Sequence, residues 1–429
     1  MPTAATNASD HHPAGGPVLA RQPAHAAILA SAGVAFLRAT GRSVLMFMLV
    51  AGLPVAAMAA DATTSVGAYA DLSAEAWSNG LPILDIDGTW QRGYKARSDT
   101  QRAYQTGRAE AGLWWRWRAM SADLPWRVGG LVRADASAIT SGQAAEVLAA
   151  YQGQRDPEVG SYDARVRGLL WKGSGWTIQV PACLSASGTW CMTLAWDHMQ
   201  LQRLRVTHTE GVASHLGDGN YAYQVQVRDD SWKTRAPFVG APASSGQGDA
   251  VSVSWRWRAA PEMQADTPEA DSPTMRVLNT LKPVEWRVQI KDVWSSLRWA
   301  DINTNLAVID SNTSQRNAQG YIDVQPLIRG RYRQQNLHER IPITTRTDIA
   351  WQADAGQWTL MLQHRQGLWQ RWLGWRGQGD VRPSVSVEPV VGVLQLGLGW
   401  GPMEVSAWTD RSDAAARVRG LALRGEWGW

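Results

Sequence analysis

Histidines gather in one stretch of the sequence beside residues that could take part in acid–base chemistry. His198 follows Asp197, His215 follows Ser214, and His208 lies between them. A serine, a histidine and a carboxylate are the groups that hydrolysis by an activated nucleophile requires. Adjacent residues of a regular strand point to opposite faces, however, so neither neighbouring pair could act directly. We therefore predict no enzyme, with a lipid hydrolase as the least favoured alternative.

Arginine is the second chemically informative residue type. The chain has 42 lysines and arginines, of which only five are lysines, leaving 37 arginines. A planar guanidinium binds carboxylate, phosphate or sulfate through two parallel hydrogen bonds. We expect thirteen of these arginines to line one interior: Arg116, Arg118, Arg127, Arg133, Arg165, Arg167, Arg228, Arg256, Arg258, Arg287, Arg329, Arg331 and Arg346.

Two interpretations of this arginine-rich face remain open. The arginines could attract an anionic solute or polymer along a pathway. They could instead pair with carboxylates in a closed polar interior, together with the bulky side chains of Trp114 and Trp171. The candidate carboxylates are Glu110, Asp135, Asp163, Asp323, Asp348 and Glu426.

The only two cysteines, Cys183 and Cys191, flank a predicted turn at residues 185–188. In an oxidising compartment they would form a disulfide that joins the two arms of a hairpin. No histidine cluster lies near them in the sequence, which disfavours a metal site. A glycine-rich phosphate loop, zinc-ligand spacing and a basic helical patch are also missing, so we predict no cofactor and no nucleic-acid partner.

The elements that would position these residues are strands of period two. In VSVSWRWRAA (251–260), Val and Trp occupy the odd positions up to Trp257, while Arg256 and Arg258 share the other face. The same alternation continues from about residue 103 to the end and yields about 14 candidate strands, within a range of 12–16. In a soluble sandwich the apolar face would be the core, whereas in a membrane barrel it would face lipid.

The N-terminal region predicts export. Residues 42–61 combine a basic flank, an apolar run and an Ala-Met-Ala site, which are the features of a cleaved signal peptide. We assign residues 1–59 to this signal, and interpret the polar segment 1–36 as an extension ahead of a start near Val34 or Leu37. Residues 60–102 form either a first strand or a short plug, and residues 103–429 form the strand-rich domain.

The C-terminal strand carries the most specific pattern. Four large apolar residues recur at odd positions and the sequence ends on an aromatic: Leu421, Leu423, Trp427 and Trp429. This stretch resembles the C-terminal strand of Gram-negative outer-membrane β-barrels, although Gly425 departs from the usual larger residue. The resemblance implies that these residues act as an assembly signal for the barrel-assembly machinery. It also implies an outer-membrane location in contact with lipid.

The abundance of tryptophan agrees with this resemblance. The chain has 25 Trp and only 3 Phe, and Trp is enriched where a barrel meets the membrane interface. We therefore predict an all-β protein, an antiparallel transmembrane β-barrel. The expected function is a channel or export pore with an arginine-rich lumen and weak anion preference. The alternative is a closed structural barrel that presents loops 140–160, 236–249 and 259–283 to an external partner.

Overall fold

The structure is a computed structural model that describes most of the chain after the predicted signal peptide. The described residues are 64–81, 98–117, 124–152, 157–183, 190–217, 220–233, 240–259, 283–310, 314–316, 322–324, 327–353, 355–412 and 416–428. Outside the described residues lie the predicted signal segment, Arg118 and Trp429. For Asp323 the structure describes the backbone of its short strand but not the side chain.

Strands dominate these residues. In chain order they are β1 (Thr64–Ser78), β2 (Gln101–Trp117), β3 (Trp126–Thr140), β4 (Gly160–Asp163), β5 (Val166–Cys183), β6 (Trp190–Gly217), β7 (Asn220–Ser231), β8 (Gly246–Arg258), β9 (Pro283–Asp310), β10 (Ser314–Arg316), β11 (Ile322–Val324), β12 (Leu327–Glu339), β13 (Thr344–Ala353), β14 (Gly356–Arg365), β15 (Leu368–Gly377), β16 (Val381–Glu388), β17 (Val393–Trp400), β18 (Met403–Thr409) and β19 (Val418–Gly428). One helix, α2 (Gly142–Gln152), lies between β3 and β4.

The main sheet closes on itself. Antiparallel pairing runs from β1 through β2, β3, β5, β6, β8, β9 and then β13 to β19, and β19 pairs back with β1. This circuit contains 14 strands, which confirms the predicted fold class and strand number. Residues 64–78, for which a strand and a plug were both open, form barrel strand β1. Closure removes the unpaired edges that an open sheet would expose.

The barrel has an apolar outside and a charged inside. In β8, Trp255 is 39% exposed on the outer wall, whereas Arg256 is 8% exposed and faces the lumen. The period-two pattern predicted this division, because alternate side chains of a strand point to opposite faces. Among the described residues, no helix has the length and apolar character needed to cross a membrane.

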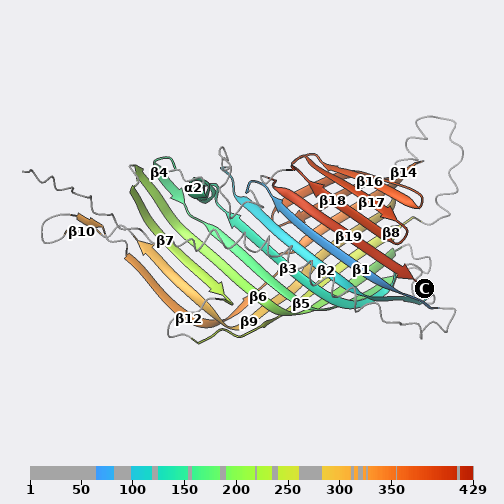
Figure 1. Ribbon diagram of the computed structural model, residues 1–429, viewed down its shortest axis with the longest axis horizontal. Helices are drawn as coiled ribbons and strands as arrows, with labels where there is room; N and C mark the ends of the chain where they lie inside the picture. Colours follow the sequence, from blue (N-terminus) through green and yellow to red (C-terminus); the bar gives the residue numbers. More distant parts are fainter. Residues whose placement is uncertain are drawn as a thin grey trace, which may run out of the picture.

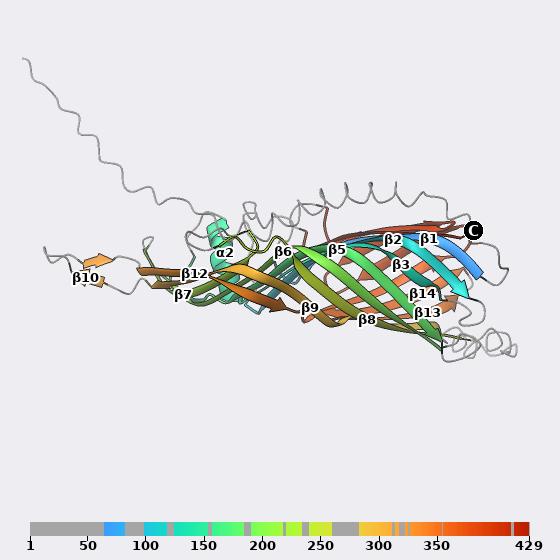
Figure 2. The same cartoon turned by 90° about the horizontal axis from the view of Figure 1, so that it is seen from below.

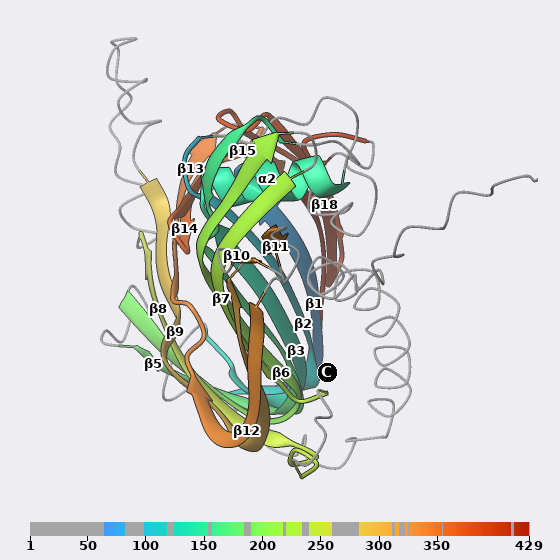
Figure 3. The ribbon, with the colours of Figure 1, turned by 90° about the vertical axis from the view of Figure 1, so that its left-hand side faces the viewer.

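Two strands are far longer than the others and continue the main sheet beyond the barrel. β6 and β9 have 28 residues each. Their first halves belong to the barrel, and their second halves, residues 204–217 and 299–310, pair with β4, β7 and β12. We call this five-stranded part the extension. Figures 1 and 2 show it continuing along the long axis beyond the barrel, and Figure 3 shows its curvature from the extension side.

The two ends of the barrel differ. β1 begins and β19 ends at one end, since Gly67 pairs with Gly428, and we call this the terminus end. The extension and α2 lie at the opposite, far end (Figure 1). β8 ends and β9 begins at the terminus end, because Trp257 pairs with Trp286. Segments 259–283 and 140–160 were both expected on the external side of the barrel, and this expectation is wrong. Segment 259–283 starts and ends at the terminus end, whereas segment 140–160 lies at the far end.

Two local expectations also need correction. Segment 140–160 contains α2, whose small residues Ala145 and Ala149 pack with Ala103 of β2; the sequence pattern did not predict this helix. The Gly-Ser-Gly segment 173–175, whose composition is typical of a turn, lies inside β5. A side chain at Gly175 would overlap the backbone oxygen of His198, so a close approach between β5 and β6, not a turn, requires glycine there.

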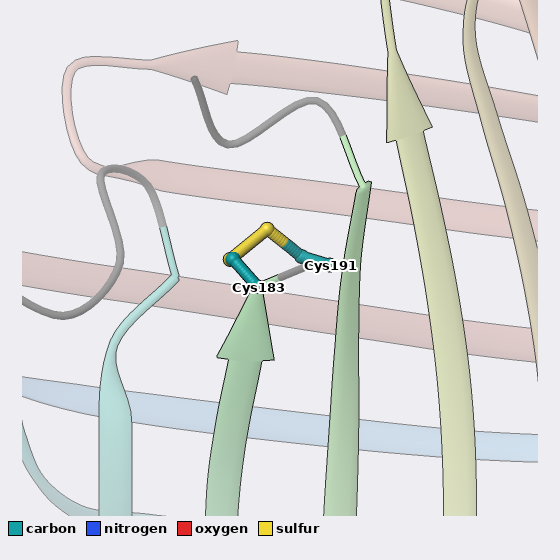
Figure 4. Close-up of a disulfide and its surroundings, with 2 residues drawn as sticks. All are labelled: Cys183 and Cys191. Carbon is teal, nitrogen blue, oxygen red and sulfur yellow. A yellow bond between two sulfur atoms is a disulfide. The ribbon is translucent and has the colours of Figure 1, made fainter. Parts of the chain in front are cut away.

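A disulfide joins the terminus-end tips of β5 and β6. Cys183 and Cys191 are bonded and lie directly opposite each other in the strand register (Figure 4). The side chain of Cys191 is buried. The bond therefore fixes the β5–β6 hairpin at the end where its two strands are connected.

Replacing both cysteines by serine should lower the free energy of unfolding by about 2–3 kcal/mol, because a short loop is no longer closed in the unfolded chain. The denaturant midpoint of the purified barrel in detergent measures this, with the reduced wild type as the matched control. Two free thiols found by mass spectrometry in the exported protein would contradict the assignment.

Candidate functional site

Charged side chains from opposite walls meet in the middle of the lumen. We call this group the charged layer. It consists of Arg108, Glu110, Arg133, Asp135, Asp197, Lys291, Asp292 and Arg365. Four basic and four acidic residues form it, so its formal charge is balanced.

Arg133 of β3 is the centre of the charged layer. Its Nη1 and Nη2 atoms each donate a 2.6 Å hydrogen bond to an oxygen of Asp292 on β9. Asp135 and Asp197 lie 3.2 and 3.6 Å from the same guanidinium. Since β5, β6 and β8 separate β3 from β9 in the barrel wall, this bidentate pair crosses the lumen.

Two further arginines join other walls to the charged layer. Arg108 of β2 donates to Asp197 of β6 at 2.5 and 3.0 Å and to Glu110 at 2.8 Å. Arg365 of β14 donates to Asp135 at 2.9 Å. Strands β2, β3, β6, β9 and β14 are therefore tied together through the interior as well as through the wall.

A β-bulge in β9 delivers Asp292 to the lumen. The register between β8 and β9 shifts between Val251 and Val253, and Asp292 has a φ of 58°. Aspartate is one of the few residues with a side chain that tolerates this left-handed conformation. Strict alternation would place Lys291 and Asp292 on opposite faces, but the bulge brings both into the charged layer.

The charged layer is dry at its centre. The side chains of Arg133, Asp135, Asp292 and Arg365 are each less than 10% exposed. Charges held away from water must be paired, because their desolvation is not otherwise compensated. Removing one partner would leave an opposite charge buried without compensation.

Water-accessible charges line the lumen on the terminus side of the charged layer. Glu426 contacts both Arg116 and Arg127, and Glu285 contacts both Arg258 and Arg287. Arg376 and Glu404 form a further pair at 2.5 Å. Most of these side chains are more than one third exposed, so this part of the lumen is a wet vestibule. Its pairs, unlike those of the charged layer, are screened by solvent.

Apolar side chains fill the interior on the far side of the charged layer. Met199 and Leu201 follow Asp197 along β6, and Leu297 and Trp299 follow Asp292 along β9. They belong to a buried cluster that also contains Leu131, Trp171, Leu204, Ala250, Ile302, Leu337 and Ile341. A second buried cluster contains Trp77, Tyr104, Leu368, Trp372, Val393 and Val418. The described lumen thus changes from wet and charged to dry and charged to apolar.

The thirteen predicted lumenal arginines fall into three groups. Those that face the barrel lumen are Arg116, Arg127, Arg133, Arg256, Arg258, Arg287 and Arg346. Those that lie on the extension or its connection are Arg165, Arg167, Arg228, Arg329 and Arg331. Arg118 lies outside the described residues. Alternation assigns a face but does not show which strands lie in the extension, which explains the second group. Arg228 of β7, and Arg329 and Arg331 of β12, belong to strands that pair with the extension halves of β6 and β9.

Sequence reasoning missed Arg108, Asp197, Asp292 and Arg365. Arg108 could have been found by continuing the alternation from Glu110 back by two residues. Asp292 depends on the bulge, so period two gives no signal for it, whereas Arg365 continues the alternation of Met361 and Gln363 along β14 and could have been found in the same way as Arg108. Trp171, expected to occlude the lumen, is 1% exposed and lies 5.3 Å from the Arg133 guanidinium.

The three histidines considered for catalysis do not come together. His198 lies on the outer wall with Asp249 at 2.8 Å, while its sequence neighbour Asp197 faces the lumen. His208 lies 3.2 Å from Glu210 on the extension, and His215 contacts the backbone oxygen of Pro157. Within the described residues, no group of three or more potential ligands has a metal-binding arrangement.

The predicted assembly residues face outward. Leu421 and Trp427 of β19 are among the exposed large apolar side chains of the outer wall. Leu423 shares their face by alternation and pairs with Leu72 of β1. Trp429 falls outside the described part of the chain.

Comparison with known proteins gives fold-level likeness alone. No family model and no curated protein matches the sequence. Among solved structures, a TodX ΔS2S3 mutant monoaromatic hydrocarbon channel matches with a TM-score of 0.35 and 8% identity, covering 86% of this chain and 90% of that one. The translocator domain of the autotransporter NalP from Neisseria meningitidis matches with a TM-score of 0.27 and 8% sequence identity, covering 94% of this chain and 99% of that one.

A third similar structure is the outer membrane protease OmpT from Escherichia coli, with a TM-score of 0.19 and 5% sequence identity. The match covers 85% of this chain and 93% of that one. Similarity at this level transfers no activity to this chain. The barrel architecture rests on the strand pairing of the chain itself.

Arg133→Met should lower the free energy of unfolding by about 3–5 kcal/mol, because it leaves Asp292 buried without its partner. Urea unfolding in detergent, followed by tryptophan fluorescence, measures the change. Arg165→Met is the matched control, since Arg165 pairs with Asp163 in full solvent, and it should leave the midpoint unchanged. Equal midpoints for Arg133→Met and wild type would show that the charged layer contributes no stability.

Proposed function

We propose that the protein is an outer-membrane β-barrel channel that is closed in the described state, with the charged layer as its gate. The membrane placement is supported by the outer wall. On β6 the outward side chains are Trp190, Met192, Leu194 and Trp196, followed by polar His198 and Gln200. With a rise of about 3.3 Å per residue and a strand tilt of about 40°, the six steps from Trp190 to Trp196 cover about 15 Å of the barrel axis. This height fits within the apolar band of about 25 Å that barrels of the outer membrane carry.

The observation that carries the gating proposal is the Arg133–Asp292 pair across the lumen, with a wet vestibule on one side of it. A permanent plug would gain nothing from buried charges, because well-packed apolar side chains of similar volume are as stable or more stable. Charged groups, by contrast, hydrate readily when the walls separate. A layer of ion pairs is therefore suited to a barrier that opens to polar solutes.

The vestibule supports a weak preference for anions. Arg116, Arg127 and Arg424 share the carboxylates of Asp71 and Glu426, and Arg258 and Arg287 share Glu285. Five arginines therefore face three carboxylates. This local excess of positive charge would attract anionic solutes at the terminus end. The channel is proposed without a catalytic step, because the histidines are separated.

Export and assembly are part of the same proposal. Residues 1–59 would act as a signal peptide for export, and the barrel-assembly machinery would recognise the C-terminal strand.

A second candidate is a permanently closed barrel that acts through the extension. The two buried apolar clusters favour it, because they fill the far half of the lumen without taking part in the ion pairs. Arg329, Arg331 and Arg333 recur at every second position of β12 and are exposed. Such a charged row could bind an anionic polymer, and it could equally protect the edge of β12 from pairing with another chain.

Removing the central pair tests the gate. Arg133→Ala with Asp292→Ala deletes the bridge between walls without changing net charge, and we expect it to convert a barrel with rare openings into one with stable conductance steps in a planar bilayer. A salt gradient across the bilayer should show a weak anion preference. Arg165→Ala with Asp163→Ala removes an ion pair of the same type from the extension connection and should behave as wild type.

The outcomes separate the two candidates. Stable conductance in the central double variant alone supports the gate. A folded central double variant that stays non-conducting would overturn it and favour the closed barrel. Large, continuously open steps in the wild type would overturn both, because neither an intact charged layer nor the apolar clusters would then close the lumen.

A further inference from the structure

Two basic side chains face each other directly on the outer wall of the barrel. Lys172 of β5 and Arg203 of β6 are register partners. Their neighbours Trp171 and Leu204, also register partners, are buried in the interior cluster. Because alternate residues point to opposite faces, Lys172 and Arg203 project outward. A bulge next to this pair, between Lys172 and Gly173, leaves Gln202 as an additional outward polar residue.

This pair has no compensating carboxylate in the described part of the chain. The Arg203 guanidinium lies 5.9 Å from the ring of Trp232, and Gln202 is engaged by donation to Ser174 at 2.8 Å. Asp249, an acidic residue of the same outer wall, is already contacted by His198 and Arg298. Like charges directly opposite in an antiparallel pair are destabilising. An anion that contacts both Lys172 and Arg203 would therefore reduce the repulsion between their positive charges.

The height of the pair on the wall indicates what that anion is. Arg203 lies 13 residues beyond Trp190 along β6, one of them in the bulge, which corresponds to about 30 Å along the barrel axis at the rise and tilt used above. The apolar band ends below it. Lys172 lies four residues, or about 10 Å along the axis, beyond Trp176, whose ring contacts Trp196. The pair is therefore at the level of lipid headgroups on the far-end side, where Trp marks the interface.

We propose that the far end, which carries the extension, faces the cell exterior, as the longer connections of outer-membrane barrels do, and that Lys172 and Arg203 form a binding site for the phosphate of an outer-leaflet lipid headgroup. The lysine supplies a compact charge and the arginine a planar donor that can bind two phosphate oxygens. Gln202 and Trp232 border the site. The inference rests on the outer-membrane placement proposed above but does not depend on whether the charged layer opens.

The test measures retention of lipopolysaccharide by the purified barrel in native mass spectrometry. The wild type should retain bound lipopolysaccharide, and Lys172→Ala with Arg203→Ala should weaken its binding at least tenfold. Arg165→Ala with Arg329→Ala removes the same number of exposed arginine or lysine charges from the extension side and should leave binding within twofold of wild type.

A charge-reversal variant separates loss of the site from loss of the fold. Lys172→Glu would pair with Arg203 in place of the lipid phosphate, so it should abolish lipopolysaccharide retention while the barrel keeps or gains thermal stability. Inorganic phosphate at millimolar concentration should not displace the lipid.

Unchanged retention in Lys172→Glu, or an equal loss in the extension control, would overturn the proposal. Displacement by inorganic phosphate would also overturn it, because the site would then be specific for a small anion and not for a lipid. Conductance of the Arg133→Ala with Asp292→Ala variant reports separately on the gate. A wild type that retains no lipopolysaccharide, together with a conducting central double variant, shows that the lipid site alone has failed. Retention by the wild type with a non-conducting central double variant shows that the gate alone has failed.

Discussion

The structure depends on one constraint: charged residues that the barrel turns inward must find partners across the lumen. With Trp and Leu on the outer wall, each guanidinium on an inner face has only opposing strands or lumenal water as its environment. Arg133 meets Asp292 and Arg365 meets Asp135 from different walls. The vestibule pairs remain hydrated, whereas the charged layer is dry, and this difference divides the lumen into a wet part and a dry part.

The long strands β6 and β9 connect this interior to a surface. The same two strands carry Asp197 and Asp292 into the charged layer, then the apolar residues beyond it, and then the extension. A displacement of the extension would therefore act on strands that hold two of the central carboxylates. The outward Lys172 and Arg203 lie where β5 and β6 leave the apolar band, so the proposed lipid site, the extension and the proposed gate share the same elements.

The sequence predicted the parts of this arrangement that follow from period two. The faces of Trp255 and Arg256, the inward Glu110 and the outward C-terminal strand needed only alternation and the terminal aromatic pattern. Asp292 was missed because a bulge changes its face. Arg329 was placed in the lumen because an extension strand such as β12 shows the same alternation as a barrel strand. Helix α2 has no strong amphipathic pattern, since its packing uses alanines. Contacts across the lumen depend on closure, which no local pattern specifies.

The central claim is that Arg133 and Asp292 join opposite walls through a dry lumen, and a double-mutant cycle tests it most directly. The free energies of unfolding of Arg133→Ala, Asp292→Ala and the double variant, each measured in the same detergent, give the coupling between the two side chains. The account predicts a coupling of more than about 1 kcal/mol, as for residues in one ion-pair network. Effects that add to within about 0.5 kcal/mol, as for independent distant sites, would contradict it.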